Sequence, residues 1–221
     1  STVDTVNIGD AAIYAWRDHG NGVNTPDNTV EIVEVDVIDD GRLLVGSKVR
    51  NIGGGMLRYE YAIYNLNSNR SVGGFVVPRS PQSQISNVGF SDVDYHSGEI
   101  YDNTDWVVEV GATTIAWHSP ESWGENPDGN AIRWGTMYNF WFDSDTGPGD
   151  FAGGAPLSII EMFIPGDPAA VDVSVPAPVG GDGGAIPTVS EWGMIALTAL
   201  LMGGGWAMIS RRRVADARAM A

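Results

Sequence analysis

The sequence predicts an all-β fold, an antiparallel two-sheet sandwich or jelly roll, followed by a Pro/Gly linker and a single C-terminal transmembrane helix. Large side chains alternate with smaller or charged ones along short segments, which is the period of a strand with one buried face. Clusters of Gly, Asn, Asp and Pro separate these segments. No stretch before Trp192 keeps the period of a helix. These observations favour two stacked sheets.

The alternation is clearest in two segments. Every second residue from Leu57 to Ile63 is large, and a second segment places Trp134, Tyr138 and Phe142 on one face. About 165 residues are enough for one well-filled core. The predicted strands, in order, are Glu31–Val37, Arg42–Val49, Leu57–Ile63, Gly74–Val77, Ile85–Phe90, Trp106–Val110, Thr113–Trp117, Trp134–Phe142, Leu157–Phe163 and Val171–Val175.

A linker is predicted after the last strand. Residues 165–168 and 176–185 mix stiff proline with flexible glycine, a composition typical of spacers. We therefore divide the chain into a β-sandwich module over residues 1–175, a linker over 176–185 without fixed structure, and a C-terminal tail over 186–221.

The tail has the features of a membrane-spanning segment. Residues 193–210 carry no charge, and 18 residues at about 1.5 Å rise span roughly 27 Å, close to the hydrocarbon thickness of a bilayer. The arginines at 211–213 would stay on the cytoplasmic side, and Trp192 occupies the place of an interfacial anchor. This orientation makes the body of the protein extracytoplasmic. Because the chain begins at Ser1, we expect either a removed export signal or a longer protein upstream.

Three parts of the tail, in order, carry a resemblance to a known family. A short motif, an apolar span and a basic end together resemble the IPTL variant of the PEP-CTERM sorting signals of exopolysaccharide-producing Gram-negative bacteria, with valine where leucine is usual. The resemblance implies recognition and cleavage by an exosortase, a membrane-embedded cysteine transpeptidase, which releases the protein or transfers it to the envelope. The residues that match the signal are Ile186, Pro187, Thr188, Val189, Glu191, Trp192, Gly193, Arg211, Arg212 and Arg213.

The body carries a weaker resemblance. Residues 58–68 and 130–140 are similar to segments of uncharacterised exported proteins of planctomycete-type bacteria. This similarity implies no activity.

Composition excludes several classes of function. The chain has no cysteine, so it has no disulfide, no thiolate metal site and no thiol nucleophile. A net charge of −16 repels nucleic acids and anionic lipid surfaces. No nucleophile elbow, phosphate loop or dinucleotide fingerprint is present, and His19, His96 and His118 lack the close spacing of a metalloenzyme motif. We predict no catalytic residues and no enzymatic activity.

One acidic loop is a candidate Ca²⁺ site. Asp143, Asp145 and Asp150 lie close together in a Gly/Pro-rich stretch, and Ca²⁺ takes six to eight such hard oxygen ligands. The loop lacks the glutamate at the twelfth position of an EF-hand, and a simple turn between two strands is the alternative.

Aromatic residues gather in the long region from Ser91 to Asn130. Sugar-binding modules use flat aromatic faces flanked by polar groups, and Trp123, Trp117, Tyr95 and Tyr101 are candidates for such a platform. The alternative is that these rings fold back and fill the ends of the sandwich.

The sequence therefore predicts an exported, non-catalytic protein of the cell surface or extracellular matrix. Its C-terminus would be cytoplasmic before cleavage, and its body would be on the surface or secreted afterwards. A carbohydrate-binding module for exopolysaccharide is one alternative, and a secreted hydrolase is a second.

Overall fold

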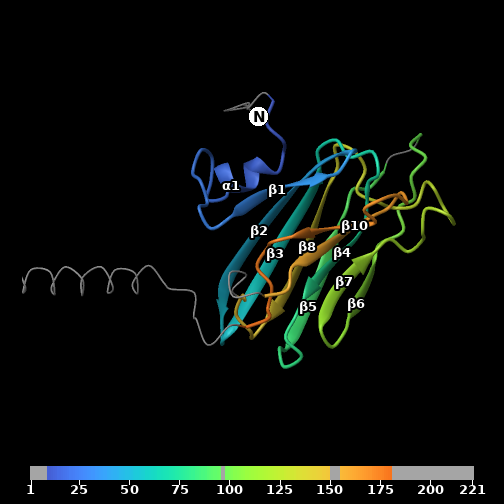
Figure 1. Cartoon of the computed structure of the whole chain (residues 1–221). Helices are drawn as coiled ribbons and strands as arrows, with labels where there is room; N and C mark the ends of the chain where they lie inside the picture. The colour runs from blue at the N-terminus through green and yellow to red at the C-terminus, as the bar shows by residue number, and fades with distance from the viewer. Residues whose placement is uncertain (1–8, 96–97, 150–154, 181–221) are drawn as a thin grey trace, which may run out of the picture. The chain divides into compact units, whose positions relative to one another are not determined.

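The computed structural model describes residues 9–95, 98–149 and 155–180, and these residues form a β-sandwich with one short helix (Figure 1). The elements in chain order are α1 (Tyr14–Asp18), β1 (Glu31–Val37), β2 (Gly41–Gly53), β3 (Met56–Asn65), β4 (Val72–Pro78), β5 (Ile85–Ser91), β6 (Val107–Val110), β7 (Thr114–His118), β8 (Met137–Ser144), β9 (Ser158–Met162) and β10 (Ala170–Val173).

The strands form two five-stranded sheets in which every pairing is antiparallel. One sheet has the order β1-β2-β3-β8-β5 and the other the order β10-β9-β4-β7-β6. The predicted all-β, two-sheet architecture is confirmed. The predicted C-terminal helix lies outside the described residues. Within those residues, no helix has the length and apolar character needed to span a bilayer.

Aromatic side chains from both sheets fill the space between them. Phe75 on β4 stacks on Trp117 of β7 at 5.9 Å between ring centroids, and it meets Tyr61 of the facing sheet edge-on at 5.4 Å. Phe140 on β8 contacts Phe75 at 5.3 Å. These side chains are all at most 2% exposed. The large aromatic residues that alternate along the strands therefore form the core between the two sheets.

The prediction of no helix before Trp192 was wrong over one turn and a half. α1 covers the outer face of the first sheet, where Ile13 is fully buried against Leu44 and Ala62. A Cβ at Gly46 would lie only 3.1 Å from the Trp16 ring, so glycine is what allows this close approach. Five residues are too few to show a helical period, which explains the miss.

The loop before β1 is fixed to β2 by a nearly buried ion pair. Asp27 accepts a hydrogen bond from Lys48 Nζ at 2.5 Å and two from Thr29. The Lys48 ammonium and the Thr29 hydroxyl lower the pKa of Asp27 to about 2. The carboxylate therefore stays ionised at neutral pH and ties α1 and its loop to the sheet.

The boundary predicted after Val175 is corrected by the structure. Residues 174–180, the closing segment, cross the end of the sandwich, and Val175 and Ala177 are at most 1% exposed. Tyr61 Oη donates to the Pro176 carbonyl at 2.6 Å, and the backbone N–H of Ser80 donates to the Pro178 carbonyl at 2.8 Å. Proline has no N–H that needs a partner, so this Pro-rich segment can be buried once its carbonyls are bonded. The rest of the predicted linker, 181–185, lies outside the described residues.

The sandwich has two distinct ends. The loop end carries the connections 38–40, 66–71, 92–95, 98–106, 119–136 and 163–169, because β3 and β9 end there and β8 begins there. The closing end carries the turns 51–55, 80–84, 111–113 and 145–149 and the closing segment, as shown by the bond from Gly149 N–H to the Ala177 carbonyl. Ten-residue β3 joins the two ends, which places them about 30 Å apart.

Candidate functional site: an aromatic hollow at the loop end

A hollow of about 300 Å³ opens at the loop end of the sandwich. It draws its walls from segments that are far apart in the sequence: the connection between β3 and β4, the region before β6, and the loop between β7 and β8. Its volume is at the lower limit of ligand pockets, which span roughly 300–1,000 Å³. We call this site the aromatic hollow, and the lining residues that give it its chemical character are Asn69, Tyr101, Trp123, Asp128, Arg133 and Trp134.

Arg133 organises the floor of the aromatic hollow. Its guanidinium carbon lies 4.5 Å from the ring centre of Tyr101 and 4.8 Å from that of Phe163. Its Nη2 donates to the carbonyls of Pro127 and Gly129 at 3.0 and 2.7 Å. Burial lowers the pKa of Arg133, which is 9% exposed, although guanidinium stays charged at neutral pH. The cation therefore holds two rings and a loop together.

Trp123 sits half-buried on the loop between β7 and β8. Its ring meets Phe163 edge-on at 5.9 Å. The loop is fixed by its own hydrogen bonds, since the Ser122 hydroxyl and backbone N–H both donate to the Glu125 carboxylate, at 2.7 and 3.0 Å. These bonds lower the pKa of Glu125. The ring of Trp123 is thus presented on a preformed turn.

Trp134 is the aromatic residue that sequence reasoning misplaced. The predicted strand Trp134–Phe142 put it on the buried face, but β8 begins only at Met137 and Trp134 is 70% exposed. The backbone N–H of Thr136 donates to the Arg133 carbonyl at 3.0 Å, and Gly135 has φ 78°, which together make a turn with glycine at its third position. The sequence Arg-Trp-Gly-Thr carries that signal, because only glycine adopts this φ without strain.

Tyr101 forms the remaining aromatic wall, and Tyr95 packs against it. Their ring centroids lie 5.1 Å apart, and Tyr95 Oη donates to the Ala131 carbonyl at 3.3 Å. Asn130 anchors the region, because its side-chain amide donates to Asp92 at 2.6 Å and accepts from Tyr138 Oη at 2.5 Å. The predicted platform residues Trp123 and Tyr101 are thus brought together, with Tyr95 packed behind Tyr101.

Trp117 is not part of this arrangement, which corrects the prediction that included it. It points inward from β7, is 0% exposed and packs on Phe75 and Phe140. A ring without exposed surface contacts no ligand. Trp117 is buried because it lies on a strand, at a position whose side chain points into the space between the two sheets, and not in a loop.

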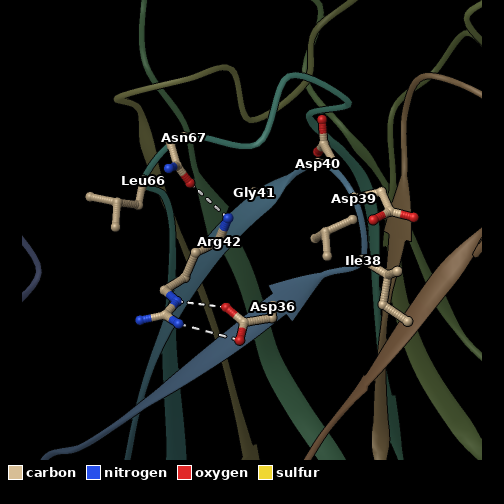
Figure 2. A pocket seen from close by; sticks show the side chains of 9 residues that line it. Asp36, Ile38, Asp39, Asp40, Gly41, Arg42, Leu66 and Asn67 are labelled. Atoms are coloured by element: carbon tan, nitrogen blue, oxygen red, sulfur yellow. Dashed lines mark hydrogen bonds and ion pairs between the residues drawn. The ribbon is translucent and has the colours of Figure 1, made fainter.

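A second, more open hollow of about 480 Å³ lies beside the turn between β1 and β2 (Figure 2). Two of its three acidic residues, Asp36 and Asp40, are hydrogen-bonded within the protein. Asp36 accepts two hydrogen bonds from the Arg42 guanidinium, and Asn67 Oδ1 accepts one from the Arg42 backbone N–H at 2.7 Å, as Figure 2 shows. Asp40 accepts hydrogen bonds from the Ser68 hydroxyl and from the backbone N–H groups of Asn69 and Arg70. This turn therefore supports the connection that forms one wall of the aromatic hollow.

The predicted Ca²⁺ loop lies at the closing end. Arg58 binds Asp143 through two hydrogen bonds of 2.7 and 2.9 Å, and Arg58 lowers the pKa of that carboxyl. Asp145 accepts a bond from the backbone N–H of Gln84 at 2.8 Å. In the part of the chain that the structure describes, no three His, Asp or Glu side chains are grouped to hold a metal ion. Asp150 lies outside that part, so Ca²⁺ binding by this loop stays a prediction.

The sorting-signal residues, from Ile186 to Arg213, also lie outside the described residues. Residues 185–213 match the family model of the IPTL-CTERM motif. No curated protein and no solved structure matches the chain, so the resemblance of the body to planctomycete-type exported proteins stays without support. The chain thus carries the C-terminal sorting signal of a secreted or cell-surface protein, which implies processing by an exosortase-type enzyme.

Proposed function

We propose that this protein is a non-catalytic component of the cell surface or extracellular matrix. Its C-terminal sorting signal delivers it to the envelope, and the chain is cleaved at that signal. The IPTL-CTERM match at residues 185–213 carries this proposal. The motif, the uncharged span of 193–210 and the arginines at 211–213 follow one another in the order that such a signal needs. The β-sandwich is then the part that acts outside the cell.

The distribution of charge along the sandwich supports this role. In the described turns of the closing end, including residues 174–180, Asp145 is the one carboxylate. The chain leaves the described sandwich at Gly180, beside the Gly147 carbonyl, and so leaves from this sparsely charged end. An anionic envelope surface would repel the opposite end far more strongly. Carboxylates crowd the loop end: Asp39, Asp40, Asp92, Asp94, Glu99, Asp102, Asp105, Glu121, Glu125 and Asp128.

A second candidate function is the binding of exopolysaccharide. The aromatic hollow favours it, because two tryptophans and a tyrosine line one concave surface. The same hollow gives little support to a secreted hydrolase. A glycosidase needs two carboxyl groups roughly 5–10 Å apart, and among the described residues that line the hollow only Asp128 has one.

Comparing three chains in the producing cell tests the proposed delivery. The full chain and a chain ending at Arg213 should share one distribution between the surface, the soluble envelope fraction and the medium, because both keep the complete signal. A chain ending at Ala185 should be distributed differently. Antibodies against the sandwich, applied to intact cells and to fractions, measure this. The chain ending at Arg213 is the matched control for truncation. An identical distribution of all three chains would contradict the proposal.

A further inference from the structure

We infer that the aromatic hollow is a binding site for an uncharged polysaccharide, with Trp123 and Trp134 as its stacking surfaces and with Asn69 and Asp128 as its hydroxyl partners. This inference rests on the second candidate function. It adds the site, the residues and the charge class of the ligand.

The exposure of the aromatic rings is the first reason. Trp134 is 70% exposed, so its ring adds little to the stability of the fold. A single exposed apolar residue is ordinary on a protein surface. Trp134, however, shares a hollow with the half-exposed rings of Trp123 and Tyr101. Flat rings around one concave surface suit the apolar faces of sugar rings.

The second reason is that the site is held in place before any ligand arrives. Tyr101 lies between the Tyr95 ring and the Arg133 guanidinium. Trp123 packs on Phe163, and its loop is closed by the bonds between Ser122 and Glu125. Side chains that are already fixed lose little conformational entropy on binding.

Polar groups free for a ligand are the third reason. Among the described residues, neither the Asn69 side-chain amide nor the Asp128 carboxylate has a hydrogen-bond partner, although their backbone groups do. Both side chains line the hollow. An amide donates and accepts, and a carboxylate accepts. Sugar hydroxyl groups do both, so the pair can bind them and fix the orientation of a ring stacked on tryptophan.

The charge of the loop end acts against an anionic ligand. The acidic residues around the loop end repel polysaccharides that carry carboxylate or sulfate groups. Arg133 gives anionic polysaccharides little electrostatic attraction, because its guanidinium already contacts two rings and its Nη2 donates to two carbonyls. A positively charged polysaccharide is attracted by the carboxylates of the whole loop end, so its binding does not require the two tryptophans of the hollow.

The position of the hollow agrees with this role. It lies at the loop end, whereas the chain continues toward the sorting signal from Gly180 at the closing end. About 30 Å of β-sandwich separates the two ends. The hollow is therefore far from Gly180, where the described chain ends.

Affinity measurements on five variants of the full chain test the inference. The variants are Trp134→Ala, Trp123→Ala, the double substitution of both by alanine, Trp123→Phe and Ile38→Ala. Ile38 is 66% exposed and lines the other loop-end hollow, so it controls for the loss of exposed apolar surface. The probes are a neutral glucan, mannan and galactan, anionic alginate and cationic chitosan, followed by affinity electrophoresis and calorimetry. Thermal unfolding of each variant confirms that it is folded.

The expected result is binding to at least one neutral polysaccharide that depends on both tryptophans, weaker or no binding to alginate, and chitosan binding that neither tryptophan affects. Each tryptophan substitution should weaken that binding about tenfold, the double substitution should abolish it, and Ile38→Ala should leave it unchanged. Trp123→Phe, which keeps a ring, should recover part of the affinity. Neutral-glycan binding that is unaffected by either tryptophan would overturn the site while leaving the second candidate function intact. Binding only to alginate, or tryptophan-dependent binding only to chitosan, would overturn the charge class. Binding to none of the probes would overturn both the site and the second candidate function.

Discussion

A chain that ends at Val175 is expected to unfold with a free energy about 2–4 kcal/mol lower than a chain that ends at Ala185. The shorter chain loses the carbonyl that accepts from Tyr61 Oη, the carbonyls bonded to Gly149 and Ser80, and the burial of Ala177. Tyr61 is 2% exposed, so its hydroxyl would be left without a partner in the interior, and burial already raises its pKa well above the ordinary value. Urea unfolding followed by tryptophan fluorescence measures the difference.

A chain ending at Gly180 is the matched control for this truncation. It keeps every described contact of the closing segment, so its midpoint should equal that of the chain ending at Ala185. If the chain ending at Val175 is as stable as both, the segment after Val175 is a linker, and the sequence-based boundary was right.

The substitution Arg58→Met should lower the free energy of unfolding by about 2–3 kcal/mol at pH 7. Methionine keeps most of the apolar stem of Arg58 but leaves the Asp143 carboxylate, whose side chain is 10% exposed, with the Asn87 amide as its remaining described side-chain partner. Arg50→Met on the neighbouring strand is the matched control. Its pair with Glu60 is longer, 3.2 Å, and 43% and 29% exposed, so the expected loss is at most about 1 kcal/mol.

The pH dependence of the Arg58→Met effect follows from the depressed pKa of Asp143. A carboxyl whose pKa is lower in the folded state stabilises the fold fully above its unfolded pKa, about 3.9, and loses this contribution as the pH falls through the folded value. The difference between wild type and variant should therefore be constant from pH 5 to 8 and shrink below pH 4. If Arg58→Met and Arg50→Met lower the free energy of unfolding equally, the Arg58–Asp143 pair stabilises the fold no more than the exposed Arg50–Glu60 pair.

The same variant bears on the Ca²⁺ prediction. If Asp143 were a Ca²⁺ ligand, Arg58→Met would free it for the ion, and millimolar Ca²⁺ would raise the midpoint of the variant more than that of wild type. If the loop is only a turn, Ca²⁺ leaves the difference between the two unchanged.

The strands could be predicted because the sequence pattern that identifies each strand lies within the strand and its flanking turns. Alternating large residues, as in 57–63, and turns rich in Gly and Asn define a strand without knowledge of its partners. α1 was missed because five residues show no period. The closing segment was missed because a Pro-rich composition is compatible with two structures. One is a free linker, and the other is a buried segment that needs few partners for its backbone N–H groups. The hydrogen bond from Tyr61 to this segment, which favours the buried structure, has no local sequence signal.

The candidate site was predictable only in part, for a related reason. Loop position drew attention to Trp123 and Tyr101, which both line the aromatic hollow. Trp117 could be assigned to the core only from the register of β7 with β4. Trp134 fits the alternation of large residues that continues into β8, so it was assigned to that strand. The turn signal of the glycine that follows it, Gly135, was not used. The aromatic hollow is assembled by Arg133, which joins rings from separate elements, and such contacts have no sequence signature.

Intact mass spectrometry of the protein recovered from the producing cell tests the central claim most directly, namely that this is an exported protein processed at its C-terminal sorting signal. If the signal is cleaved at its motif, as we propose, the C-terminus of the recovered protein lies between Pro187 and Glu191, and the apolar span and the arginines are removed. A mass that includes Arg211, Arg212 and Arg213 would show that the tail is kept, and it would contradict the account.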